Sequence, residues 1–222
     1  MQLEDPSWEV LLLGIGNILW ADEGFGPRCV EHFHRIYRDR PDVEVVDGGT
    51  LGLYLTNYIT SAKRLLVLDC VDFKEKPGFM KVLREDELQV WSSTKISQHQ
   101  TGFNDMLATA MLLGHEFEKI TVIGVQPDVL DDYGGGLTPT LQAVLPKAVE
   151  LAAAELADWG FPVEKRPEGE EPEPLMASCV EEDNYVGQRP SEDEACRDGD
   201  ERFMVREKGQ EMHDPNVPPM RS

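Results

Sequence analysis

Four acidic residues follow short apolar runs of the chain, and one histidine stands near the start of a predicted helix. These five residues are Asp22, Glu23, Asp47, Asp69 and His99. Two carboxylates and an imidazole form an open nitrogen and oxygen ligand set for a borderline divalent metal ion. A carboxylate beside a histidine can instead act as a general base without a metal. Both interpretations require Glu23, Asp69 and His99 to come together in the fold.

The elements that would position them alternate between strands and helices. We expect strands at 10–13, 43–46, 65–68 and 120–125, and a weaker one at 80–83. Helical periodicity covers 27–38, 52–62, 98–114 and 138–158. A capping box at Ser97 and Gln100 and the pair Thr138-Pro139 mark two helix starts. This order predicts a doubly wound α/β fold, in which ligands collect beyond the carboxyl ends of the strands.

Each candidate ligand also has an ordinary structural interpretation. Glu23 could stabilise a helix N-terminus, Asp69 could cap a turn, and His99 could be a solvated polar residue. Their convergence at the strand ends is the feature that favours a joint metal site. Cys70, beside Asp69, invites a nucleophile hypothesis. A small apolar residue at a strand end is its more ordinary explanation.

The glycine-rich loop from Gly14 to Gly26 begins like a dinucleotide-binding fingerprint but departs from it. Leu19 occupies the place of the third glycine, and Asp22-Glu23 would put anions where a pyrophosphate needs amide groups. Asp47 lies too far along the chain to be the ribose-binding acid. We therefore interpret these glycines as allowing a tight turn after a strand.

The chain's charge excludes two classes of partner. The 222 residues include 42 acidic and 21 basic side chains, giving a formal net charge of -21. Nucleic-acid backbones and anionic membrane surfaces repel such a polyanion. No apolar run is long enough to span a membrane, and no basic region precedes the run at 10–13. Four scattered cysteines indicate free thiols, so we expect a cytoplasmic protein.

Composition divides the chain at residue 162. Residues 163–222 contain 17 acidic residues, 8 basic residues and 7 prolines. Such a segment buries too little apolar surface to offset its ordering entropy. We therefore predict a folded domain at 1–162 and an acidic, proline-rich, disordered tail at 163–222.

Several short segments resemble, in chain order, the nickel–iron hydrogenase maturation proteases. They are GIGNILWADEGFGPR (14–28), DGGTLG (47–52), LVLDCVD (66–72), KISQHQTG (95–102), GVQPD (124–128) and GLTPTLQ (136–142). The resemblance runs from about residue 8 to residue 160, and the combination of segments is far more specific than any one of them. Cys70 departs from the alanine-like residue expected there.

The resemblance implies a fold and an activity. The fold is a phosphorylase/hydrolase-like, three-layer αβα sandwich around a five-stranded, mostly parallel sheet of order 2-1-3-5-4, with strand four antiparallel. The activity is that of an aspartyl-type endopeptidase that removes the C-terminal extension of the hydrogenase large-subunit precursor after nickel insertion. A non-catalytic, nickel-sensing chaperone or scaffold that docks on the large subunit is the alternative.

The resemblance also assigns the site. Glu23, Asp69 and His99 would recognise the nickel, which the substrate supplies, while Asp47 and Asp69 would be the catalytic residues. The expected partner is the nickel-loaded precursor, and the enzyme itself is expected to be a monomer without a cofactor of its own.

Overall fold

The computed structural model describes residues 7–84, 87–88 and 98–188, and their side chains except those of 98–104. Five strands form one sheet: β1 (Trp8–Ile15), β2 (Val43–Gly49), β3 (Ala62–Cys70), β4 (Met80–Arg84) and β5 (Lys119–Val125). Their order is β2-β1-β3-β5-β4. β1, β2, β3 and β5 run parallel, whereas β4 pairs antiparallel with β5. The expected strand order and the reversed fourth strand are confirmed.

Helices occupy the connections between the strands. They are η1 (Ala21–Gly24), α1 (Phe25–Ile36), η2 (Gly52–Leu55), α2 (Thr56–Thr60), α4 (Gln98–Leu112), α5 (Pro139–Asp158) and α6 (Glu182–Gly187). The helical segment predicted at 52–62 is present as two short helices, η2 and α2. It ends at Thr60 because β3 begins at Ala62, which pairs with Trp8 of β1. Thr138 caps α5 as predicted, accepting a hydrogen bond from the Leu141 amide. Ser97, the expected cap of α4, lies outside the described residues.

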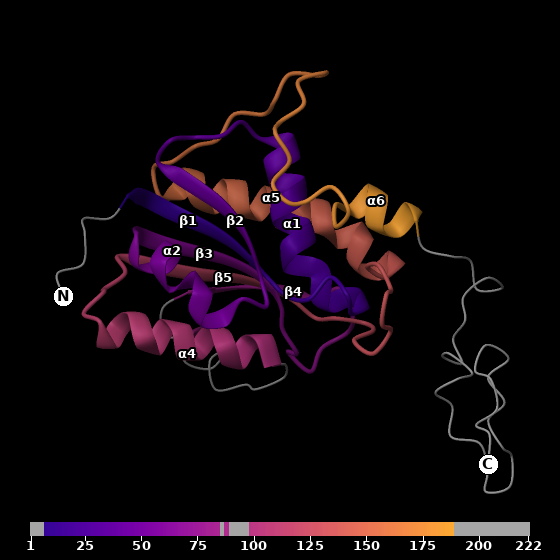
Figure 1. Cartoon of the computed structure of the whole chain (residues 1–222), viewed down its shortest axis with the longest axis horizontal. Coiled ribbons are helices and arrows are strands. Elements are labelled where there is room, and N and C mark those ends of the chain that lie inside the picture. Colours follow the sequence, from indigo (N-terminus) through magenta and orange to yellow (C-terminus); the bar gives the residue numbers. More distant parts are fainter. Residues whose placement is uncertain (1–6, 85–86, 89–97, 189–222) are drawn as a thin grey trace, which may run out of the picture. The chain divides into compact units, whose positions relative to one another are not determined.

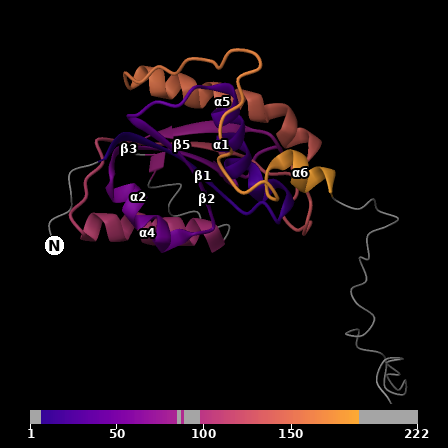
Figure 2. The same cartoon turned by 45° about the horizontal axis from the view of Figure 1, so that its top comes forward.

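The helices cover both faces of the sheet, as Figures 1 and 2 show. α1 and α5 lie on one face, and η2, α2 and α4 lie on the other. Alternation along β1 explains this arrangement, because Val10 and Leu12 face α1 and α5 while Leu11 and Leu13 face the opposite layer. Each parallel strand is therefore apolar on both sides, which accounts for its uninterrupted apolar run. The expected three-layer αβα sandwich is confirmed.

In the described part of the chain, no helix combines the length and the apolar character needed to cross a membrane.

Residues 163–187, here called the C-terminal strap, belong to the same compact unit as the sheet. The Arg166 amide donates to the Ile36 carbonyl at 2.7 Å, and the apolar strap residues Val163 and Leu175 pack against the core. The strap continues from α5 along α1 to α6 (Figure 1). The domain boundary predicted at residue 162 is thus wrong for these residues. Residues 189–222 lie outside the described part, and the disordered tail stays a prediction there.

Candidate active site

The loop after β1 folds back tightly over the carboxyl ends of β1 and β3. A Cβ atom on Gly26 would lie 2.2 Å from the Ile15 carbonyl oxygen and 2.3 Å from that of Leu68. Gly16 has a φ of +144°, and a Cβ there would lie 1.9 Å from the Glu23 carbonyl oxygen. Only glycine permits these approaches. They explain the glycines without a nucleotide and place η1 directly over the strand ends.

Glu23 is held on this turn by its own backbone. Its amide donates to the Trp20 carbonyl at 2.9 Å, and its carbonyl accepts from the Asn17 amide at 3.0 Å. Its side chain is half-buried. The fold therefore fixes the position of Glu23 at the carboxyl edge of the sheet, as predicted for a member of the site.

Asp69 and Cys70 end β3 directly beneath η1. Asp69 is fully buried, and the Cys70 thiol donates to the Asp22 carbonyl oxygen at 2.7 Å. Burial raises the pKa of Cys70 well above its usual value, and the charges of Asp69, Asp22 and Glu23 raise it further. These shifts keep the thiol protonated, which argues against the nucleophile hypothesis. The Cys70–Asp22 hydrogen bond brings the end of β3 against η1, and the meeting of the Glu23 and Asp69 carboxylates stays a prediction.

Asp22 has a structural role different from that of its neighbour Glu23. Its carboxylate is fully buried and accepts backbone hydrogen bonds from Asp128 and Val129, both at 2.9 Å, and from Thr138 at 2.7 Å. The Thr138 hydroxyl donates a fourth hydrogen bond at 3.1 Å. Asp22 therefore fastens the η1 turn to the connection between β5 and α5.

Asp47 lies at the carboxyl end of β2, beside the same edge. Its Oδ1 accepts from the Gly49 amide at 3.0 Å, and the Gly16 amide donates to the Gly49 carbonyl at 3.1 Å. Burial raises the pKa of Asp47, although the Gly49 hydrogen bond and the positive charge of Arg28 oppose that rise. Asp47 is thus a carboxyl group that holds its proton more strongly than an exposed aspartate does.

His99 is the second residue of α4, and its side chain lies outside the described residues. α4 ends shortly before β5 begins at the amino edge of the sheet, so its first residues lie toward the carboxyl edge. Among the described side chains, no three His, Cys, Asp or Glu residues are grouped as metal ligands. The meeting of the imidazole with Glu23 and Asp69 therefore stays a prediction.

An ion pair on α1 was not anticipated from the sequence. Arg28 and Glu31 are both buried, and their side chains meet at 2.7 Å. The positive charge of Arg28 lowers the pKa of Asp47, and the negative charge of Glu31 raises it. Their spacing of three residues on a predicted helix was the available signal, but such charges usually lie on a solvated face.

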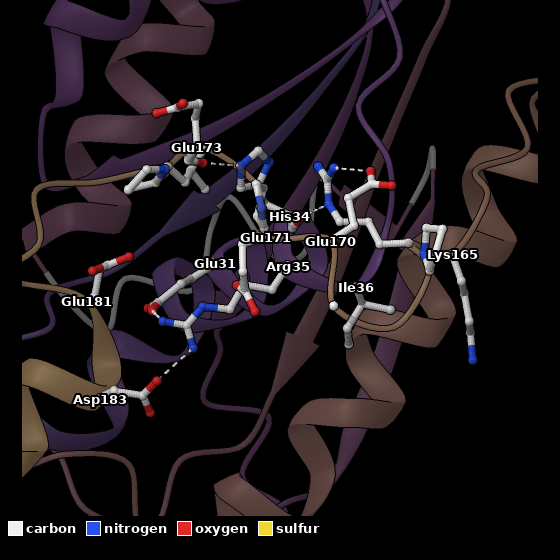
Figure 3. A pocket seen from close by; sticks show the side chains of 16 residues that line it. Glu31, His34, Arg35, Ile36, Lys165, Glu170, Glu171, Glu173, Glu181 and Asp183 are labelled. Atoms are coloured by element: carbon white, nitrogen blue, oxygen red, sulfur yellow. Dashed lines mark hydrogen bonds and ion pairs between the residues drawn. The ribbon is translucent and has the colours of Figure 1, made fainter.

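A cavity of about 580 Å³ opens between α1 and the strap, and Glu31 of the buried ion pair is among the residues that line it. Figure 3 shows charged side chains around it, and Arg35 reaches Asp183 at 3.2 Å there. The lining includes neither Glu23, Asp47 nor Asp69. The cavity is therefore distinct from the predicted site.

Comparison with known proteins decides the family. The model of the hydrogenase maturation protease family matches residues 27–155. The chain belongs to this family. Five of the six segments that carried the resemblance lie within this range, and the assignment made from the segments is confirmed.

Individual relatives agree with the family. The hydrogenase expression/formation protein HupD of Rhizobium leguminosarum bv. viciae is 45% identical over 181 residues, covering 81% of this chain and 90% of its own length. The hydrogenase 2 maturation protease of Escherichia coli K12 is 38% identical over 152 residues, covering 68% of this chain and 92% of its own.

A solved structure agrees as well. The hydrogenase maturating endopeptidase HybD from E. coli superposes with a TM-score of 0.67 at 36% identity, covering 71% of this chain and 98% of that one. This member of the family is thus a hydrolase with the protease fold, and it extends beyond the length of that endopeptidase.

Proposed function

We propose that this protease removes the C-terminal extension of the nickel–iron hydrogenase large-subunit precursor after nickel has been inserted. In this proposal it acts in the cytoplasm as a monomer and recognises the substrate's nickel through Glu23, Asp69 and His99. The observation that supports the proposal is the close approach of η1, which carries Glu23, to the end of β3, which carries Asp69. The Cys70 thiol donates there to the Asp22 carbonyl oxygen at 2.7 Å.

The chemistry of this ligand set suits a metal that belongs to the substrate. Two carboxylates and one imidazole leave coordination positions open, whereas a structural metal site is closed by four protein ligands. Asp69 has no exposed surface, so its participation requires η1 or the surrounding side chains to shift when the precursor binds. Glu23 is half-buried, and in this proposal it meets the metal before Asp69 does.

We propose that Asp47 and Asp69 supply the acid–base chemistry of an aspartyl-type endopeptidase. Hydrolysis adds water to the scissile carbonyl carbon, breaks the C–N bond and transfers a proton to the departing amine. A carboxylate accepts the proton of the attacking water, and a carboxyl group with a raised pKa can donate to the amine. The raised pKa of Asp47 supports the donor role for that residue. Nickel, when bound in the precursor, would polarise a nearby carbonyl group.

The test is incubation of the purified chain with nickel-loaded and metal-free precursor, followed by mass measurement of the large subunit. The proposal expects loss of the extension from the nickel-loaded form alone. Cleavage of the metal-free form at the same rate would contradict nickel recognition and favour a metal-free carboxylate–histidine base. Docking without cleavage would favour a chaperone or scaffold.

Single-residue variants test which residues form the site. Glu23→Gln, Asp69→Asn and His99→Ala should each slow cleavage by roughly 10²-fold or more while the melting temperature stays close to that of the parent. Glu116→Gln, which changes an exposed glutamate at the amino edge, is the matched control and should cleave normally. Parental rates for folded Asp69→Asn and His99→Ala would show that the site is misassigned.

A further inference from the structure

Large apolar side chains are exposed on three connections that border the candidate site. They are Leu19, Trp20 and Tyr133 on one side, and Leu51, Leu53 and Tyr54 on the other. We call these six residues the apolar rim. Tyr54 is 86% exposed, Tyr133 67% and Leu53 59%. Single exposed apolar residues are ordinary, but a group of them around a site indicates an interaction surface.

The side of the rim that consists of Leu19, Trp20 and Tyr133 is rigidly held. Trp20 and Tyr133 form an antiparallel backbone bridge, and their rings meet edge to face with centroids 5.2 Å apart. The Gly134 amide donates to the Leu19 carbonyl at 2.7 Å. Buried Asp22 fastens the same two loops together. The pair is therefore organised before a partner arrives, which lowers the entropy lost on binding.

The other side of the rim, which consists of Leu51, Leu53 and Tyr54, is also held by backbone hydrogen bonds. The Leu51 amide donates to the Gly48 carbonyl, and the Tyr54 amide donates to the Leu51 carbonyl, both at 3.1 Å. Leu55, at the end of η2, is buried in the core that α4 covers. This anchor turns the chain inward at Leu55 and leaves Leu53 and Tyr54 directed toward solvent.

Both sides of the rim are joined to candidate site residues. The Trp20 carbonyl accepts from the Glu23 amide, and Leu51 is bonded to the turn that also binds the Asp47 side chain. The loop after β1 meets the end of β2 where the Gly16 amide donates to the Gly49 carbonyl. A protein substrate that brings its metal to Glu23 and its scissile bond to Asp47 would therefore come close to both sides of the rim.

We infer that the apolar rim is the docking surface for the folded body of the large-subunit precursor, an inference that rests on the proposed function. Because the rim itself is apolar, we expect its occupant to be an apolar protein surface, and the net charge of -21 disfavours an acidic one. Exposed tryptophan and tyrosine on a rigid base are the residues that most often dominate binding energy. The rim contributes affinity, while Glu23, Asp47, Asp69 and His99 act on the metal and the peptide bond.

Steady-state cleavage of nickel-loaded precursor tests this inference. Leu53→Ser/Tyr54→Ser and, separately, Tyr133→Ser should raise KM about tenfold or more, leave kcat within about twofold, and leave the melting temperature close to the parent. Leu112→Ser is the matched control, because Leu112 is 88% exposed at the far end of α4. It should change none of these quantities.

The outcomes separate this inference from the proposed function. If the parent cleaves but the rim variants keep the parental KM, or lose only kcat, the rim is not the docking surface and the proposed function stands. If the parent does not cleave, the proposed function fails, and direct binding of precursor to the same variants decides the rim. Concentration-dependent dimers that the rim variants abolish would assign this surface to a second copy of the chain instead.

Discussion

Adjacent residues of like charge have different roles at the carboxyl edge of this sheet. From the sequence, Asp22 and Glu23 are two acids in one loop, and nothing in their spacing ranks them. The fold separates them, because Asp22 is buried under four hydrogen bonds whereas Glu23 is half-buried at the edge. The candidate acids could thus be found from the sequence. Their division into a structural and a site residue depends on donors from 128–138, over a hundred positions away.

Asp22→Asn should destabilise the protein. An amide group in place of one carboxylate oxygen turns a donor toward backbone N–H groups that need acceptors, whichever way the side chain is oriented. The cost of a buried unsatisfied donor is about 1–3 kcal/mol, so thermal unfolding should shift downward by several degrees. Glu23→Gln is the comparison and should leave the transition in place. Equal melting temperatures for the two variants would contradict the structural role of Asp22.

Asp47→Asn should stabilise the protein at neutral pH. Burial raises the pKa of Asp47 in the folded state above its ordinary value of 3.8. The neutral carboxyl group therefore adds to stability below pH 3.8, and this contribution is lost as the pH rises through the raised pKa. Asparagine stays neutral and keeps the oxygen that accepts from Gly49. Thermal melts should therefore show a gain at pH 7 that disappears below pH 3.8. A gain independent of pH would point to packing instead.

At the scale of elements, apolar runs proved a good guide to strands and a weaker one to short helices. All five strands were predicted because runs such as 10–13 and 65–68 are apolar on both faces, which a central parallel strand requires. The segment 52–62 has helical periodicity, but competition with β3 shortens it to η2 and α2. Local patterns do not reveal where a neighbouring strand begins to pair.

Glu155 joins α5 to the strands β4 and β5, and its removal should loosen this edge of the sheet. Burial alone would raise the pKa of Glu155, but hydrogen bonds from Arg84, Thr121 and Trp159 outweigh burial and lower it. The contribution of Glu155 to the free energy of unfolding is therefore present above its ordinary pKa of 4.5. It is lost as the pH falls through the lowered pKa of the folded state.

Glu155→Gln should cost about 2 kcal/mol at pH 7, or roughly 4–8 °C in melting temperature. The difference from the parent should shrink in acid, where the parental carboxylate is protonated too. Glu150→Gln, an exposed position on the same helix, should melt like the parent. A Glu155→Gln difference that stays constant from pH 7 to pH 3 would contradict the charge-based explanation.

At the scale of the whole molecule, composition misplaced the end of the folded unit. The strap is acidic and proline-rich, yet polar contacts with α1 help to hold it. Arg28 donates to the Val180 carbonyl at 2.7 Å, and the Glu182 amide donates to Glu31 at 3.0 Å. Glu182 also binds His32 at 2.6 Å. A buried ion pair on α1 thus binds the main chain of a segment some 150 residues later. The low apolar content of that segment does not reveal these polar contacts.

Two truncations test this view of the strap. Ending the chain after Pro162 removes the partners of Arg28 and Glu31, which are then left as buried charges with fewer hydrogen bonds, and uncovers the core contacts of Val163 and Leu175. We expect a loss of about 3 kcal/mol, or roughly 6–12 °C in melting temperature.

Ending the chain after Gln188 keeps all of these contacts. It removes a segment rich in charge and poor in apolar residues, so the transition should stay within about 2 °C of the parent. If the chain ending at Pro162 melts with the parent, the strap contributes nothing to stability and the boundary predicted from composition is the correct one. If the chain ending at Gln188 also melts early, residues beyond 188 stabilise the fold, contrary to their composition.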